Sequence, residues 1–190
     1  MRMEWSAEEL VASWTLVGED WSLVGNKTGA TRLGFAVLLK FFEIEARFPR
    51  SADELPQSAV TYLAEQLKVD PQVLAGYDWS GRTIKYHREQ VRAAFGFREF
   101  TRGDEDKLAG WLAEEVCPVE LRDEQLREVL LVRCRTERIE PPGWGQFKQR
   151  LARTTPDLYN YGQIKQPATE VLMIAAEDWA QRTGWTDPSR

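Results

Sequence analysis

The chain has 190 residues, 43% of them hydrophobic and 29% charged, with a formal net charge of -5 at pH 7. This composition excludes a disordered polymer, because there is enough apolar surface to bury one sizeable core or two small ones. The longest strongly apolar run, residues 33–44, is interrupted by Gly34 and Lys40 and is too short to cross a bilayer. No signal peptide is visible, so we expect a cytoplasmic protein with no membrane partner.

Residue types that carry most catalytic and metal chemistry are scarce. His87 is the one histidine, and its place on the apolar side of a predicted helix indicates a packed, neutral ring. Cys117 and Cys134 lack CxxC spacing and histidine partners, which favours two buried free thiols. No glycine-rich phosphate motif or GxSxG pattern occurs. We therefore expect no metal, no cofactor, no small-molecule substrate and no catalytic residue.

Charge alternates in blocks along the chain. Residues 51–78 and 103–128 are acidic, whereas residues 79–102 and 129–155 each hold six Lys or Arg against two Glu. A polyanion responds to charges within a Debye length, about 8–10 Å, so an acidic protein can still present basic faces. The pattern predicts two local cationic surfaces.

Helical periodicity recurs throughout, without hairpin dipeptides or sustained two-residue alternation, and it predicts an all-α fold. Ser6 and Glu9 form a capping-box pattern that predicts a helix to about residue 17. The next predicted helix, residues 28–46, is apolar around most of its circumference. Such a helix is typically central and packed on several sides.

The stretch that follows predicts a helix-turn-helix unit. An apolar stripe indicates a helix over 58–67, Asp70 and Pro71 begin a short one, and Ser80 caps a longer one. The polar face of this last helix is predicted to hold Arg82, Lys85, Tyr86, Glu89 and Arg92. In a helix-turn-helix unit the last helix can lie in the major groove of DNA. A solvated face that binds nothing is the competing interpretation.

A second unit of the same kind is predicted downstream. An apolar stripe over 108–116 stops at Pro118, and Asp123 caps another helix. After a break at 141–143, a helix from Trp144 is predicted to bury Phe147 and Leu151 and to expose Gln146, Gln149, Arg150 and Arg153. The predicted organisation is tandem helix-turn-helix-like modules: 1–102, 103–155, and a tail over 156–190 with one amphipathic helix over about 167–184.

Three long strings carry a family resemblance: GATRLGFAVLLKFFEIEARFPR (29–50), AVTYLAEQLKVDPQVLAGYDWSGRTIKYHREQVRAAFGFRE (59–99) and WLAEEVCPVELRDEQLREVLLVRCRTERIEPP (111–142). In this order they closely resemble the amino-terminal region of Tn-three family transposases, the replicative enzymes of class II bacterial transposons. The resemblance implies a helical region with helix-turn-helix-like modules that binds the terminal inverted repeats of the transposon.

The same resemblance implies that this chain does not cut DNA. In the family, strand cleavage and joining belong to an RNase H-like domain with acidic, metal-binding residues much farther along, and no acid here matches that motif. We expect a non-catalytic fragment or relative, truncated before the catalytic domain, whose residues 154–190 diverge from the family.

The first hypothesis is therefore double-stranded DNA binding at transposon ends. The candidate contacts are Arg82, Thr83, Lys85, Tyr86, Arg88 and Arg92 in the first module, Gln146, Gln149, Arg150 and Arg153 in the second, and Lys27, Thr28 and Arg32 at the start of the central helix. One alternative is a protein-interaction fragment that pairs with itself or with a full-length transposase and inhibits it. Another is a helix-turn-helix transcription repressor that binds a palindromic site as a homodimer.

Overall fold

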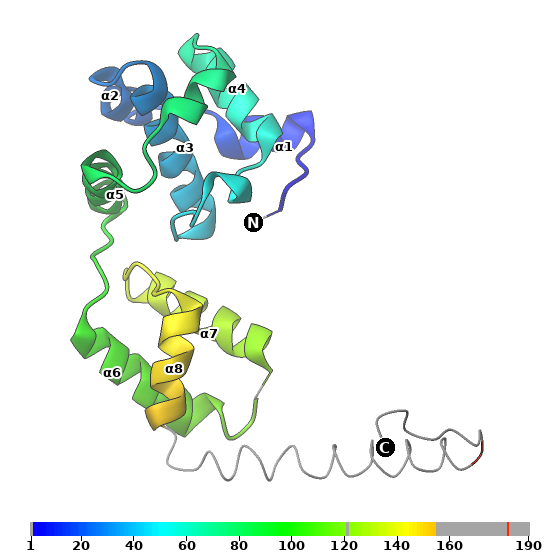
Figure 1. Cartoon of the computed structure of the whole chain (residues 1–190), viewed down its shortest axis with the longest axis vertical. Helices are drawn as coiled ribbons and strands as arrows, with labels where there is room; N and C mark the ends of the chain where they lie inside the picture. The colour runs from blue at the N-terminus through cyan, green and yellow to red at the C-terminus, as the bar shows by residue number, and fades with distance from the viewer. Residues whose placement is uncertain (1, 121, 155–181, 183–190) are drawn as a thin grey trace, which may run out of the picture. The chain divides into compact units, whose positions relative to one another are not determined.

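The computed structural model describes residues 2–120, 122–154 and 182, and within them it contains helices and no strand (Figure 1). The predicted all-α fold is confirmed. No helix within the described residues is both long enough and apolar enough to span a membrane. The amphipathic helix predicted over 167–184 lies outside the described part of the chain, apart from Arg182.

The helices follow one another closely along the chain. In order they are α1 (Ala7–Trp14), α2 (Asp20–Gly25), α3 (Gly29–Glu45), the 3-10 turn η1 (Ala52–Glu54), α4 (Gln57–Leu67), the 3-10 segment η2 (Pro71–Gly76), α5 (Arg82–Phe95), α6 (Arg102–Trp111), the π-helical turn η3 (Leu112–Val116), α7 (Asp123–Thr136) and α8 (Trp144–Thr154). The α2 helix has no counterpart among the elements expected from the sequence.

The chain divides into two compact units. The first holds residues 1–102 together with 127–142, and the second holds 103–126 and the described residues from 143 on. Residues 127–142 therefore group with the first unit, although the sequence pattern placed them in the middle of the module 103–155. A parallel backbone bridge between Arg98 and Ile139 accompanies this grouping: Arg98 N donates to Arg138 O, and Glu140 N donates to Arg98 O, each at 2.9 Å.

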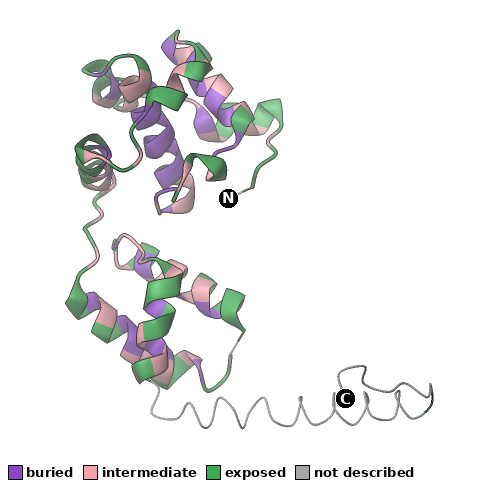
Figure 2. Ribbon diagram, viewed as in Figure 1, coloured by how far each residue is buried: buried purple, intermediate pink, exposed green. Residues whose placement is uncertain are grey.

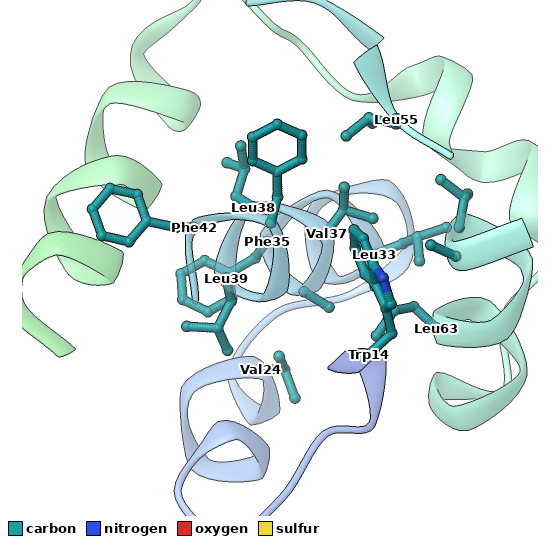
Figure 3. Packing of buried hydrophobic residues seen from close by; sticks show 14 of the residues in the cluster. Trp14, Val24, Leu33, Phe35, Val37, Leu38, Leu39, Phe42, Leu55 and Leu63 are labelled. Carbon is teal, nitrogen blue, oxygen red and sulfur yellow. The ribbon is translucent and has the colours of Figure 1, made fainter. Parts of the chain in front are cut away.

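The α3 helix forms the centre of the first unit. Every residue from Leu33 to Phe42 is buried (Figure 2). The other helices α1, α2, α4 and α5, together with η2, pack on it and surround it with apolar side chains such as Trp14, Val24 and Leu63 (Figure 3). A helix that is apolar all round can be stable in water only if it is covered on all sides, so the predicted central helix is confirmed.

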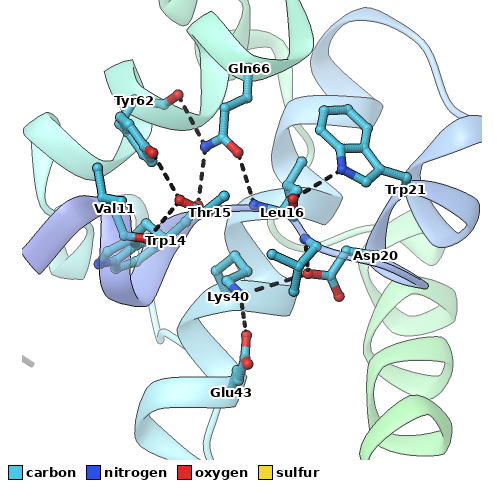
Figure 4. A network of polar contacts seen from close by, with 11 residues as sticks. Val11, Trp14, Thr15, Leu16, Asp20, Trp21, Lys40, Glu43, Tyr62 and Gln66 are labelled. Atoms are coloured by element: carbon cyan, nitrogen blue, oxygen red, sulfur yellow. Dashed lines mark hydrogen bonds and ion pairs between the residues drawn. The ribbon is translucent and has the colours of Figure 1, made fainter.

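Two polar side chains of the first unit, Lys40 and Gln66, have partners within the fold (Figure 4). Lys40 is only 3% exposed, and its ammonium pairs with Glu43 and lies 3.7 Å from a carboxylate oxygen of Asp20. Gln66 of α4 donates to Trp14 O at 3.1 Å and accepts from Leu16 N at 2.8 Å. Gln66 thus satisfies backbone groups where α1 ends, which is why α1 stops at Trp14 and not near residue 17.

Local caps predicted from the sequence are present. Ser6 N donates to Glu9 Oε2 at 2.8 Å, and Glu9 N donates to Ser6 Oγ at 3.3 Å, which completes the capping box of α1. Asp70 accepts from Gln72 N at 2.8 Å and starts η2. These contacts span two or three residues, so they do not depend on the tertiary structure.

Replacement of Gly34 tests how closely the core is packed. A Cβ at this position would overlap the ring of Tyr77, so Gly34→Ala is expected to lower the free energy of unfolding by about 1–3 kcal/mol in a urea titration. Gly25→Ala is the matched control, because its Cβ would meet no atom within 4 Å, and a change within about 0.5 kcal/mol is expected. Equal effects of the two changes would contradict the proposed overlap.

Candidate functional site

The α5 helix has two distinct faces. Ile84, His87 and Val91 are buried on the inner face, which packs on α3. The outer face exposes Arg82, Thr83, Lys85, Tyr86 and Glu89. The inner contacts therefore determine which side chains of α5 reach the solvent, and these include the first four predicted contact residues.

His87 anchors the inner face. Its Nδ1 lies 2.8 Å from the Tyr77 hydroxyl, and its ring meets Phe35 edge to face at 5.1 Å. Burial, assisted by the nearby Lys27 ammonium, lowers the pKa of His87 to about 4, and burial raises the pKa of the Tyr77 phenol. The prediction of a packed, neutral histidine is confirmed.

Asp78 organises the start of α5. Its Oδ1 accepts hydrogen bonds from Ser80 N and Gly81 N, both at 2.9 Å, and these bonds lower the pKa of the Asp78 carboxyl. The expected cap, Ser80, is one residue too early: Gly81 occupies the N-cap position. Sequence reasoning missed Asp78, although Asp-Trp-Ser-Gly is a typical Asx-turn sequence.

Two exposed cations lie at the start of the outer face of α5. Within the described part of the chain, neither the Arg82 nor the Lys85 side chain makes a hydrogen bond or an ion pair. Tyr86 is 57% exposed, and its hydroxyl accepts from Gln90 Nε2 at 3.2 Å. The first half of α5 therefore presents two free positive charges beside two hydroxyl-bearing side chains.

Arg88 and Arg92, also predicted as contacts, are engaged within the protein. Arg88 donates to Pro49 O at 3.2 Å, and its guanidinium lies over the ring of Phe48. Arg92 Nη1 lies 2.5 Å from Glu140, and its side chain is only 15% exposed. The expectation that Arg92 shares the free face of α5 is therefore wrong, because Glu140, 48 residues later in sequence, neutralises it.

Of the three residues predicted as contacts at the start of α3, Lys27 is buried. Lys27 is 8% exposed, its ammonium donates to Leu23 O at 2.7 Å, and it lies 3.8 Å from the centre of the Phe35 ring. Burial lowers the pKa of Lys27. Thr28 is exposed as the N-cap of α3, and Arg32 is half-buried. The proposed phosphate contact by Lys27 is therefore corrected, since its charge is enclosed by the protein.

In the second unit, α8 buries Phe147 and Leu151 as predicted. Its outer side exposes Gln146, Gln149 and Arg153, but Arg150 pairs with Asp106 of α6. Lys148 pairs with Asp123, the first residue of α7, which also accepts from Trp144 Nε1 at 2.9 Å. Acids of the block 103–128 thus neutralise cations of the block 129–155.

Residues 1–154 match the protein family described as "Domain of unknown function (DUF4158)". The chain belongs to this family. Over 101 residues this DUF4158 chain is 30% identical to "Transposase for transposon Tn501" of Pseudomonas aeruginosa. The match covers 50% of the chain and 10% of the transposase, so the chain spans only about a tenth of that curated relative. The DUF4158 chain is thus related to transposases.

The described residues of the DUF4158 chain hold no group of three or more His, Cys, Asp or Glu arranged to bind a metal. Cys117 and Cys134 are buried thiols that are not joined in a disulfide.

The pH dependence of stability tests the buried state of His87. Because the folded pKa is about 4 and below the ordinary value, the unfolded chain takes up a proton first as the pH falls. The free energy of unfolding should fall by about 2 kcal/mol between about pH 7 and pH 5 relative to His87→Gln, which can still accept from Tyr77. Parallel pH profiles of the two proteins would contradict the assignment.

A double-mutant cycle tests the Arg92 pair. Arg92→Gln, Glu140→Gln and the double variant should give a coupling of about 1 kcal/mol in urea unfolding, because both side chains are partly shielded from water. Amide exchange at Arg98 N and Glu140 N should accelerate in either single variant, since these groups form the adjacent bridge. Additive single effects would show that the pair does not stabilise the bridge.

Proposed function

We propose that this chain binds double-stranded DNA through the outer face of α5, as the part of a transposase that recognises the terminal inverted repeats of its transposon. The observation that carries the proposal is the pair of exposed cations Arg82 and Lys85, which have no partner among the described residues and lie at the start of a helix whose other face is buried. The relationship to a transposase supports the same conclusion.

The chemistry of these side chains suits recognition in the major groove. Arg and Lys can donate to O6 and N7 of guanine or neutralise a phosphate, and the threonine methyl can contact thymine. Thr83 and Tyr86 add hydroxyl groups of the kind that bind phosphate oxygens. Because α5 is anchored on α3 through Ile84, His87 and Val91, its outer face can meet DNA without first being ordered.

A second contact is proposed for α8, with Gln146, Gln149 and Arg153. Its contribution to affinity should be smaller, because Arg150 and Lys148 already pair with acids of the same unit. Thr28 and Arg32 remain peripheral candidates in the first unit. On this proposal the protein acts in the bacterial cytoplasm at the nucleoid, and the chain itself performs no catalysis.

The test is fluorescence anisotropy with a duplex carrying a class II terminal inverted repeat and a scrambled duplex, across a series of salt concentrations. Arg82→Ala or Lys85→Ala should lower the ratio of the two affinities by about 5- to 100-fold, because one bidentate base contact contributes roughly 1–3 kcal/mol of discrimination. The slope of affinity against salt reports how many phosphates are neutralised.

Lys68→Asn is the matched control, since Lys68 is another exposed cation of the first unit and its left-handed backbone accepts asparagine. This variant should keep the wild-type affinity ratio. If the Arg82 and Lys85 variants keep the wild-type ratio of affinities for the terminal-repeat and scrambled duplexes, base recognition by α5 is excluded. Dimerisation without salt-sensitive DNA binding would instead favour pairing with a second transposase chain.

A further inference from the structure

The first unit contains a hollow of about 360 Å³ beside the C-terminal end of α5. It is lined by Phe42, Glu43 and Ala46 of α3 and its C-cap, Phe95 and Phe97 at the end of α5, and Arg135, Thr136 and Arg138 at the end of α7. A volume near the lower end of the usual range for ligand sites, about 300–1,000 Å³, suits one small planar group and not a helix or a duplex.

The floor of the hollow is aromatic. Phe42 stacks on Phe95 at a centroid distance of 5.8 Å and meets Phe97 edge to face at 5.0 Å. Phe42 is almost completely buried, whereas Phe95 and Phe97 keep part of their surface exposed. The exposed parts of these two rings add apolar surface to the lining of the hollow, although Phe42 lies against one side of Phe95 and Arg138 lies over Phe97.

The rim of the hollow is positively charged. Arg138 donates to Phe95 O at 3.1 Å and lies 5.5 Å from the centre of the Phe97 ring, so its guanidinium is held at the rim. Arg135 is exposed and has no hydrogen-bond or ion-pair partner within the described residues. The one acid of the rim, Glu43, already pairs with Lys40. The charge thus favours an anionic occupant.

We propose that this hollow binds one unpaired nucleotide of single-stranded DNA, with its base on Phe95 and Phe97 and its phosphate at Arg135 and Arg138. Aromatic rings beside cations are the common means by which proteins hold unpaired bases. The inference rests on the proposed DNA binding and deepens it. Duplex DNA would bind at the start of α5, and a single-stranded extension would bind at the end of the same helix, about 20 Å away.

The experiment compares three labelled probes on the full chain: a blunt duplex, the same duplex with a three-nucleotide single-stranded extension, and hexathymidylate. The extended duplex should bind about 5- to 10-fold more tightly than the blunt duplex, as expected for one stacked base. Arg135→Gln and Phe97→Leu should abolish this gain. Phe97→Tyr, which keeps an aromatic ring, and Lys68→Asn, which removes a cation elsewhere in the unit, should retain it.

Circular dichroism and urea unfolding establish that each variant folds, and Arg135→Gln changes only an exposed side chain. No gain from the extension in the wild-type protein, or a gain that persists in both Arg135→Gln and Phe97→Leu, would overturn the inference. A competition assay adds an acidic aromatic peptide at a concentration equal to that of hexathymidylate. Displacement of hexathymidylate would assign the hollow to a protein partner and would also overturn the proposed nucleotide site.

Failure of the proposed function is distinguishable from failure of this inference. If the blunt duplex does not bind, the duplex contact on α5 is excluded. The binding of hexathymidylate then tests by itself whether the hollow holds a nucleotide. About 10-fold weaker binding of hexathymidylate by Arg135→Gln then supports the nucleotide site, whereas equal binding by wild-type and variant protein excludes it.

Discussion

The enclosure of α3 is the constraint on which the rest of the first unit depends. A helix that is buried from Leu33 to Phe42 must be covered on every side, and α1, α2, α4, η2 and α5 provide that cover. The close approach of Tyr77 to Gly34 brings the tyrosine hydroxyl to His87, and His87 fixes the inner face of α5. The apolar composition of one helix thereby determines which face of another meets the solvent.

The folded structure determines which of the cations in the basic blocks can bind a partner. Most cations of the basic blocks find acids or carbonyl groups inside the fold: Arg92 meets Glu140, Arg88 meets Pro49 O, and Arg150 meets Asp106. The ion pairs of Arg92 and Arg150 contribute little net field at a distance, because the two charges cancel, whereas Arg88 keeps its charge but is held against the protein by Pro49 O. Within the part of the chain that the structure describes, Arg82 and Lys85 have no hydrogen-bond or ion-pair partner, so the unengaged cations of α5 lie in its first half. The proposed DNA contact on α5 therefore uses two of the six cations in the block of residues 79–102.

The end of α5 differs from its start in both structure and proposed role. It leads through Gly96, in the left-handed conformation, to the bridge that joins Arg98 with Ile139. This bridge and the Arg92 pair hold the end of α7 beside Phe95 and Phe97, and the aromatic hollow forms there. The first unit therefore combines the basic face that we propose for duplex DNA with a small hollow lined by aromatic rings, which differs in chemical character.

The sequence alone determined the all-α class, most of the helices, the caps of α1 and η2 and the central place of α3, because each follows from periodicity or from contacts within a few residues. It missed α2, and it gave only the apolar side of α5 on which His87 lies, whereas burial against Tyr77 and Phe35 lowers the pKa of the histidine. It also carried the relationship to transposases in its long ordered strings. Tertiary structure alone decided the partners of Arg92, Lys27 and Arg150, the end of α1 at Trp14 and the grouping of residues 127–142 with the first unit. These features join residues that are mostly distant in sequence, or they depend on how deeply a side chain is buried. Periodicity reports which face of a helix is polar, but only the folded chain shows which charges on that face are already neutralised.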